Sequence, residues 1–120
     1  MTRLTRSTSF IAVSVLGLAF GTWAPVAAKA PVASCGGRTA TIVSGAGTIV
    51  GTESADVIVV TGTTAHTVQA LGGDDVVCGS MANDTIYGGQ GNDRIDGRGG
   101  DDVLSGDAGD DVVFGANGND

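Results

Sequence analysis

The chain has 120 residues, of which 21 are Gly and only five are Phe, Trp or Tyr. Three of these five lie within the first 23 positions, so the remainder has too few aromatic side chains for an ordinary two-layer globular core. All 13 acidic residues lie at or after Glu53, and the formal net charge of −7 argues against nucleic acid and anionic membrane surfaces as partners and favours cations.

Residues 1–28 are predicted to be a signal peptide. Two Arg in the first six positions precede an apolar run over residues 10–20, which is too short for a membrane span and has the length of a signal-peptide core. The small residues Val26-Ala27-Ala28 then predict cleavage before Lys29. We therefore expect a secreted, extracellular protein with no stable membrane span. An uncleaved N-terminal anchor is the alternative.

Residues 29–69 are predicted to form an N-terminal cap and degenerate copies of a nine-residue repeat. Val, Ile and Thr alternate here and indicate short strands. One copy, over residues 51–59, carries Asp56 at its sixth position. The next segment, over residues 60–69, is one residue too long, and His66 stands where an Asp is expected. We interpret these copies as turns that bind little or no metal.

The chain has two cysteines, Cys35 and Cys78. Outside the cytosol an even number of cysteines favours a disulfide, with two free thiols or an intermolecular bridge as the alternatives. Closing a loop of this length would stabilise the folded chain by roughly 4 kcal/mol, through the lost entropy of the unfolded state. In a domain this small, that is a large share of the total stability.

Residues 70–120 divide without a gap into blocks of nine residues, the last of which stops at its sixth position. Position five is Asn or Asp in every block, and position eight is aliphatic wherever the block reaches it. Position six is always Asp, which gives Asp75, Asp84, Asp93, Asp102, Asp111 and Asp120. A disordered acidic tail would not keep such a phase, so the pattern predicts a repeat architecture.

Each block predicts a loop followed by a short strand. Gly, Asn and Asp at positions one to six tolerate left-handed backbone angles, so this part of the block can curl tightly. Positions seven to nine are predicted to form a three-residue strand whose middle side chain, at position eight, points inward. The predicted fold is therefore an all-β parallel β-roll, a β-solenoid with two blocks per turn and a narrow aliphatic core.

In such a coil alternate blocks stack, and the position-six Asp residues form two columns. Neighbouring backbones would lie roughly 4.8 Å apart. At an effective dielectric of about 20, two carboxylates that close repel by about 3.5 kcal/mol. A hard dication would remove this conflict, and carboxylates with backbone carbonyls suit Ca²⁺ better than Mg²⁺. The predicted sites join Asp75 with Asp93, Asp84 with Asp102, Asp93 with Asp111, Asp102 with Asp120 and, more weakly, Asp56 with Asp75.

One block, Gly88-Gly89-Gln90-Gly91-Asn92-Asp93-Arg94-Ile95-Asp96, has the form G-G-x-G-x-D-x-U-x and resembles the hemolysin-type, or repeats-in-toxin (RTX), calcium-binding family. The resemblance covers residues 70–120 well and residues 51–69 weakly. It implies a β-roll with Ca²⁺ held between turns by the position-six Asp residues and loop carbonyls. Gly79-Ser80-Met81-Ala82 departs from the family's Gly pattern, which bears on the sites of Asp84. The layout is also similar to that of small secreted calcium-binding proteins of actinobacteria.

Three functions are compatible with these patterns. The first is a stand-alone secreted calcium-binding protein without enzymatic activity, because the chain has no H-E-x-x-H, no G-x-S-x-G and no convincing nucleophile-base-acid set. The second is a calcium-binding fragment of a larger secreted enzyme or adhesin, since the chain ends within a repeat. The third is a structural solenoid that binds no metal tightly. The first predicts a chain that is largely disordered without Ca²⁺ and folds on binding it. No protein or cell-wall partner is indicated by the sequence.

Overall fold

The computed structural model describes residues 32–120, and the predicted signal peptide, residues 1–28, lies outside the described residues. Val32–Asp120 form one unit of the chain. Among these residues no helix is long and apolar enough to cross a membrane.

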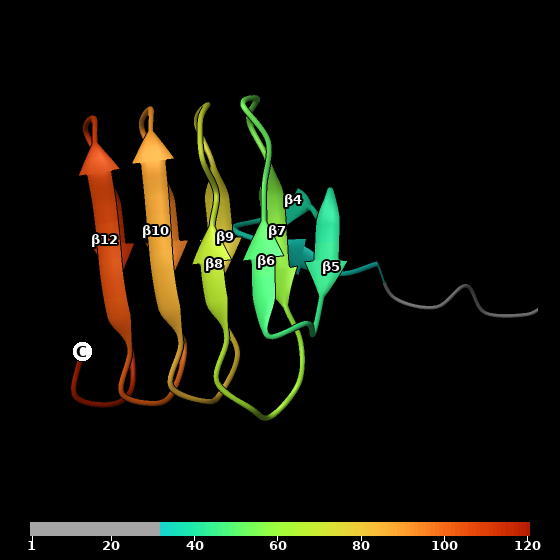
Figure 1. Cartoon of the computed structure of the whole chain (residues 1–120), viewed down its shortest axis with the longest axis vertical. Helices are drawn as coiled ribbons and strands as arrows, with labels where there is room; N and C mark the ends of the chain where they lie inside the picture. The colour runs from blue at the N-terminus through green and yellow to red at the C-terminus, as the bar shows by residue number, and fades with distance from the viewer. Residues whose placement is uncertain (1–31) are drawn as a thin grey trace, which may run out of the picture. The chain divides into compact units, whose positions relative to one another are not determined.

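The described residues form a coil of short strands (Figure 1). The strands are β3 (Ser34–Cys35), β4 (Arg38–Thr39), β5 (Ile42–Ser44), β6 (Thr48–Val50), β7 (Val57–Val60), β8 (Thr67–Gln69), β9 (Val76–Cys78), β10 (Thr85–Gln90), β11 (Arg94–Asp96), β12 (Val103–Ala108) and β13 (Val112–Phe114). Strands β6, β8, β10 and β12 build a four-stranded sheet, and β5, β7, β9, β11 and β13 build a five-stranded sheet. Neighbours in both sheets are parallel, and successive strands from β5 onward alternate between the sheets. The predicted all-β parallel β-roll with two blocks per turn is therefore confirmed.

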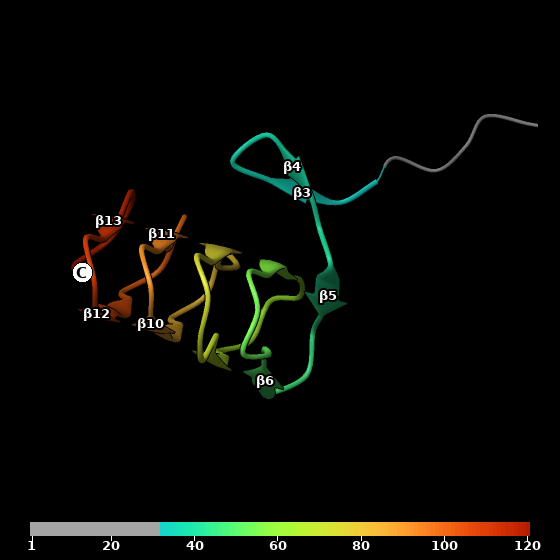
Figure 2. The same cartoon turned by 90° about the horizontal axis from the view of Figure 1, so that it is seen from above.

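The hydrophobic core lies between these two sheets, which form two facing rows in Figure 2. In the four-stranded sheet Ile86 is in register with Val68 on one side and Leu104 on the other. The corresponding ladder in the five-stranded sheet consists of Ile42, Ile58, Val77, Ile95 and Val113. Strands β5 to β12 thus supply these ladder side chains to the interior, because alternate residues of a strand point to opposite faces, whereas Val113 of the last strand, β13, is 43% exposed.

Strands β10 and β12 are longer than the three residues predicted. Each covers six residues, because pairing continues into the next block with Gly89 opposite Asp107 and Gln90 opposite Ala108. In β10 this continuation passes through Gly89, which has a φ of 108° and where a Cβ would overlap the carbonyl of Leu71, whereas β12 continues through Asp107 with a φ of 68°. The prediction of a uniform three-residue strand was therefore wrong on this side of the roll.

A hairpin of β3 and β4 packs against β7 and β9 on the outer face of the five-stranded sheet (Figure 2). Beneath it, Cys35 packs with Val57, Val59 and Val76 in a second apolar cluster. A disulfide between Cys35 and Cys78, with Cα atoms 5.8 Å apart, joins the hairpin to β9. Strand β7 is consequently buried on both faces, which explains its uninterrupted Val-Ile-Val-Val sequence.

The segment over residues 60–69 forms a half-turn despite its extra residue. Its strand β8 keeps Val68 in register with Ile49 and Ile86. The extra residue lies in the loop before β8, and His66, at the end of that loop, occupies the place that Asp takes in other blocks and is buried. An extra residue is thus tolerated in a loop without a shift of the strand register.

Candidate metal centre

The loops between the strands stack the position-six residues into two columns. The first column contains Asp56, Asp75, Asp93 and Asp111, and the second column contains His66, Asp84, Asp102 and Asp120. Within a column the amide N–H of one residue donates to Oδ1 of the next, as from Asp75 to Asp93 at 2.8 Å. The structure therefore brings together the loops of all five residue pairs named from the sequence, including Asp56 with Asp75, at 2.7 Å.

Position five links the same loops in the opposite direction. Oδ1 of Asp74 accepts the amide N–H of Asn92 at 2.9 Å, and Oδ1 of Asn92 accepts that of Asp110 at 2.9 Å. The second column repeats this ladder with Asn83, Asp101 and Asn119. Each turn needs a short side chain with an acceptor oxygen here, which explains why position five is always Asn or Asp. Sequence reasoning missed this structural role.

The second carboxylate oxygen of three column members has no hydrogen-bond partner. Oδ2 of Asp75, Asp93 and Asp102 is buried and unpaired, and these residues are only 1%, 2% and 3% exposed. Within residues 32–120, His66 and Asp84 are the only basic and acidic side chains that lie within 4.0 Å of each other. No Lys or Arg therefore compensates the charge of the three carboxylates. A buried charge without a partner strongly destabilises a fold.

The electrostatic conflict also appears in the pKa values of these carboxyl groups. Burial raises the pKa of Asp75 to about 6, the hydrogen bond from the Asp56 amide opposes this shift, and repulsion by Asp93 and Asp56 adds to it. Burial, followed by repulsion from column neighbours, likewise raises the pKa of Asp93 and of Asp102. Loss of solvation is thus a larger cause than the repulsion that the spacing predicted, and a nearby positive charge would relieve both.

Glycine at position one lets an unpaired carboxylate oxygen and a loop carbonyl oxygen both lie close to its Cα. A Cβ at Gly88 would overlap Oδ2 of Asp93 and would lie 2.8 Å from the carbonyl oxygen of Gly106, one turn further along. The corresponding residues in the next block are Gly97, Asp102 and Gly115. Within residues 32–120 no three Asp, Glu, His or Cys side chains converge on one point. Carboxylates of one column together with loop carbonyls are hard oxygen ligands that fit Ca²⁺.

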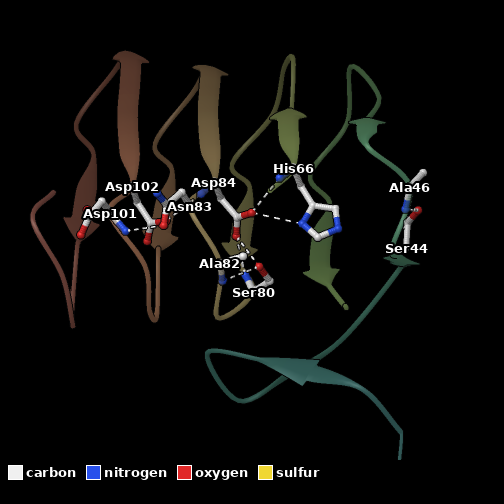
Figure 3. A network of polar contacts seen from close by, with 9 residues as sticks. All are labelled: Ser44, Ala46, His66, Ser80, Ala82, Asn83, Asp84, Asp101 and Asp102. Carbon is white, nitrogen blue, oxygen red and sulfur yellow. Dashed lines mark hydrogen bonds and ion pairs between the residues drawn. The ribbon is translucent and has the colours of Figure 1, made fainter. Parts of the chain in front are cut away.

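Asp84 differs from these residues because protein donors occupy both of its carboxylate oxygens (Figure 3). Oδ1 accepts the amide N–H of His66 at 3.0 Å and lies 3.1 Å from its Nδ1. Oδ2 accepts the amide N–H of Ser80 at 2.6 Å and its hydroxyl at 2.9 Å. The departure of this block from the Gly pattern therefore has a structural consequence, since Ser80 supplies hydrogen bonds that glycine lacks.

Asp56 is satisfied in the same way. Its Oδ2 accepts the amide N–H of Thr52 at 2.7 Å and the Thr52 hydroxyl at 2.9 Å, and its Oδ1 accepts the Thr41 hydroxyl at 3.2 Å. Sequence reasoning missed these contacts, although Gly51-Thr52 and Gly79-Ser80 share the signal of a hydroxyl residue after the first Gly.

The last member of each column lies in the C-terminal turn. Asp111 is half-buried and Asp120 is exposed. Each accepts the amide N–H of the preceding column member, Asp93 at 2.9 Å and Asp102 at 3.0 Å. Both residues therefore continue the columns, with more contact with solvent than the members before them.

Comparison with known families agrees with this arrangement. The family model of the RTX calcium-binding nonapeptide repeat, in four copies, matches residues 67–86 and 87–120. No curated protein and no solved structure matches the chain. The likeness to small actinobacterial proteins stays a prediction.

Proposed function

We propose that this chain, which carries RTX calcium-binding nonapeptide repeats, is a secreted and non-enzymatic protein that holds Ca²⁺ between the stacked loops of its roll. The observation that carries the proposal is the buried, unpaired Oδ2 atom of Asp75, Asp93 and Asp102. The same chain supplies both the carboxylates and the adjacent carbonyl oxygens that a hard cation requires.

The residues of one column would act in pairs. In Asp93 and Asp102, Oδ1 accepts the amide N–H of the preceding column member, and the unpaired Oδ2 is left for a cation. The first glycine of a block has no side chain to separate the oxygen atoms beside it, which at Gly88 are Oδ2 of Asp93 and the carbonyl oxygen of Gly106. A bound Ca²⁺ would supply the positive charge that these buried carboxylates lack.

Calcium binding and folding are coupled in this proposal. The unpaired carboxylates come together only in the coiled chain, so the unfolded chain has no equivalent site. A ligand that binds only the folded state stabilises it by mass action. Affinity is expected to be on the order of 0.1 to 1 mM per isolated site, as in other extracellular modules.

Calorimetry on the purified protein in metal-free buffer tests the binding. Titration with CaCl₂ should give saturable heat, and circular dichroism should gain strand signal at millimolar Ca²⁺ and lose it with chelator. MgCl₂ is the matched control and should have a much smaller effect, because Mg²⁺ demands stricter octahedral geometry. No heat together with unchanged spectra would refute the proposal and favour a metal-free structural solenoid.

Secretion is tested separately from binding. The protein expressed with residues 1–28 in a bacterial host should be recovered from outside the cytoplasm, with an N-terminus at Lys29 by peptide sequencing. Recovery only from the cytoplasm, with Met1 retained, would contradict the proposed export.

A further inference from the structure

The second position of each block divides the loops into two kinds, which we name closed and open. In the closed loops this residue is Thr52 or Ser80, and its amide and hydroxyl both donate to Oδ2 of the Asp four residues later. In the open loops it has a left-handed φ between 68° and 108°, and these residues are Leu71, Gly89, Arg98, Asp107 and Ala116. The backbone at position two therefore takes one of two conformations.

The hydroxyl group is what distinguishes the closed loops chemically. Besides donating to Asp84, the Ser80 hydroxyl accepts the amide N–H of Ala82 at 3.1 Å. The Thr52 hydroxyl accepts the amide N–H of Ser54 at the same distance. A short side chain that both donates and accepts can hold the loop against its own Asp. None of the residues at position two of the open loops has a hydroxyl group.

The two kinds of loop differ in what satisfies the carboxylate. In the closed loop, Oδ2 of Asp84 accepts two hydrogen bonds from Ser80. In the open loops, Oδ2 of Asp75, Asp93 and Asp102 is buried and accepts none. A hydroxyl residue at position two and a bound cation are thus alternative partners of the same oxygen atom.

We propose that the residue at position two determines which loops require a cation. Thr52 and Ser80 close their loops and make Asp56 and Asp84 independent of metal, whereas the open loops hold Ca²⁺ through Oδ2 of their Asp. This inference rests on the proposed function and narrows it, because Asp84 becomes a structural residue and the site between its loop and the next depends on Asp102.

Arg98 allows a matched test of the proposal. Arg98→Ser creates the Gly-Ser dipeptide of the closed loop beside Asp102, and Arg98→Ala removes the same charge without adding a hydroxyl. Ala116 occupies position two with a φ of 73°, so alanine is compatible with the open conformation. In calorimetric titrations we expect Arg98→Ser to bind at least one Ca²⁺ fewer per chain than Arg98→Ala. In metal-free buffer its urea midpoint should be higher.

Ser80 allows the reverse test. Ser80→Gly should open the loop of Asp84, lower the urea midpoint in metal-free buffer and add a bound Ca²⁺. Ser80→Thr keeps the hydroxyl, as Thr52 does naturally, and should leave both quantities at the wild-type value. This pair separates the effect of the hydroxyl from that of any change at this position.

The outcomes separate this inference from the proposed function. Equal Ca²⁺ counts and equal metal-free midpoints for Arg98→Ser and Arg98→Ala would overturn the inference while leaving calcium binding by the wild type intact. A wild-type protein that binds no Ca²⁺ would overturn the proposed function. In that event a higher metal-free midpoint of Arg98→Ser than of Arg98→Ala would still support closure by the hydroxyl, and equal midpoints would reject it.

Discussion

The N-terminal turns, residues 32–87, and the C-terminal turns, residues 88–120, share one coil but are stabilised by different means. The N-terminal turns have a hairpin, a disulfide and a second apolar cluster around Val57 and Val76. The disulfide and the second apolar cluster do not extend to residues 88–120, and Val112 and Phe114 on the outer face there are exposed. The comparison teaches that one backbone pattern can be held by covalent and apolar contacts at one end and, if the proposed function holds, by a cation at the other.

The position-six residues follow the same division. Asp56 and Asp84, the first carboxylates of their columns, are saturated by protein donors. Asp93 and Asp102, in the C-terminal turns, keep an unpaired oxygen. Asp75 is the exception, because it lies among the N-terminal turns and is also unpaired. The sequence predicted a chain that is largely disordered without Ca²⁺, and the position of the unpaired carboxylates leads us to expect this disorder mainly in the C-terminal turns.

Removal of calcium should have the largest effect on the structure, and it should act on the C-terminal turns. Hydrogen exchange in metal-free buffer is expected to show loss of amide protection over residues 88–120, with protection retained in β7 and β9. The reason is that unpaired buried carboxylates concentrate in the C-terminal turns, whereas the disulfide and the second cluster support β7 and β9. Uniform loss of protection across both regions would break the comparison.

Removal of the disulfide should weaken the N-terminal turns next. The double substitution of Cys35 and Cys78 by Ser is expected to lower the free energy of unfolding of the metal-free protein by roughly 4 kcal/mol, the entropy of the released loop. Urea unfolding followed by circular dichroism measures this. The same double variant in excess Ca²⁺ is the control and should regain strand signal, since the C-terminal sites are untouched. A metal-free midpoint equal to that of the wild type would show that the hairpin does not stabilise this end.

Asn substitutions at Asp93 and Asp56 should act in opposite ways. Asp93→Asn removes a ligand and is expected to weaken the calcium midpoint roughly tenfold, about 1.4 kcal/mol, yet it should leave the metal-free protein equally stable or more stable. Asp56→Asn breaks a satisfied hydrogen-bond network and should lower metal-free stability by about 1 to 2 kcal/mol, with little change in calcium affinity. Similar calcium midpoints for the two variants would contradict the division of the carboxylates.

A pH dependence of the metal-free stability is also expected, and it comes from Asp75. Because burial raises its pKa to about 6 in the folded chain, above the ordinary value of 3.8, the folded chain binds the proton more tightly than the unfolded chain. The stabilisation that comes from protonation of Asp75 is fully present below the ordinary pKa. It is lost as the pH rises through the pKa of the folded chain. Metal-free protein should therefore have a higher urea midpoint at about pH 4 than at about pH 7. Asp75→Asn should reduce that difference, and an unchanged difference would assign the effect to other groups.

The nine-residue period allowed much of the fold to be predicted from the sequence. Aliphatic residues at position eight, such as Ile86 and Ile95, form the inner ladders because one coil takes two nine-residue blocks and the middle residue of each short strand faces inward. The stacking of alternate Asp residues followed from the same period, including the half-turn that leads from Asp56 to Asp75.

Other features depend on contacts that a local period does not encode. The hairpin covers β7 and β9 through packing of Cys35 against residues far along the chain, and only the uninterrupted apolar sequence of β7 indicated a second buried face. The pairing of His66 with Asp84 required a knowledge of which loops stack. The six-residue strand β10 includes Gly89, which lets the backbone of Leu71 in the neighbouring turn approach, and this is a tertiary effect.

The two side-chain ladders, at positions five and six, have a consequence for how such a protein can change in length. Both ladders join residues 18 positions apart throughout the turns after Asp75. A tandem duplication of eighteen codons in this region would thus insert a complete turn in which every new residue meets the same kind of neighbour as before. Gain or loss of eighteen-residue units would therefore lengthen or shorten the roll without a change in the kind of contact that each turn makes.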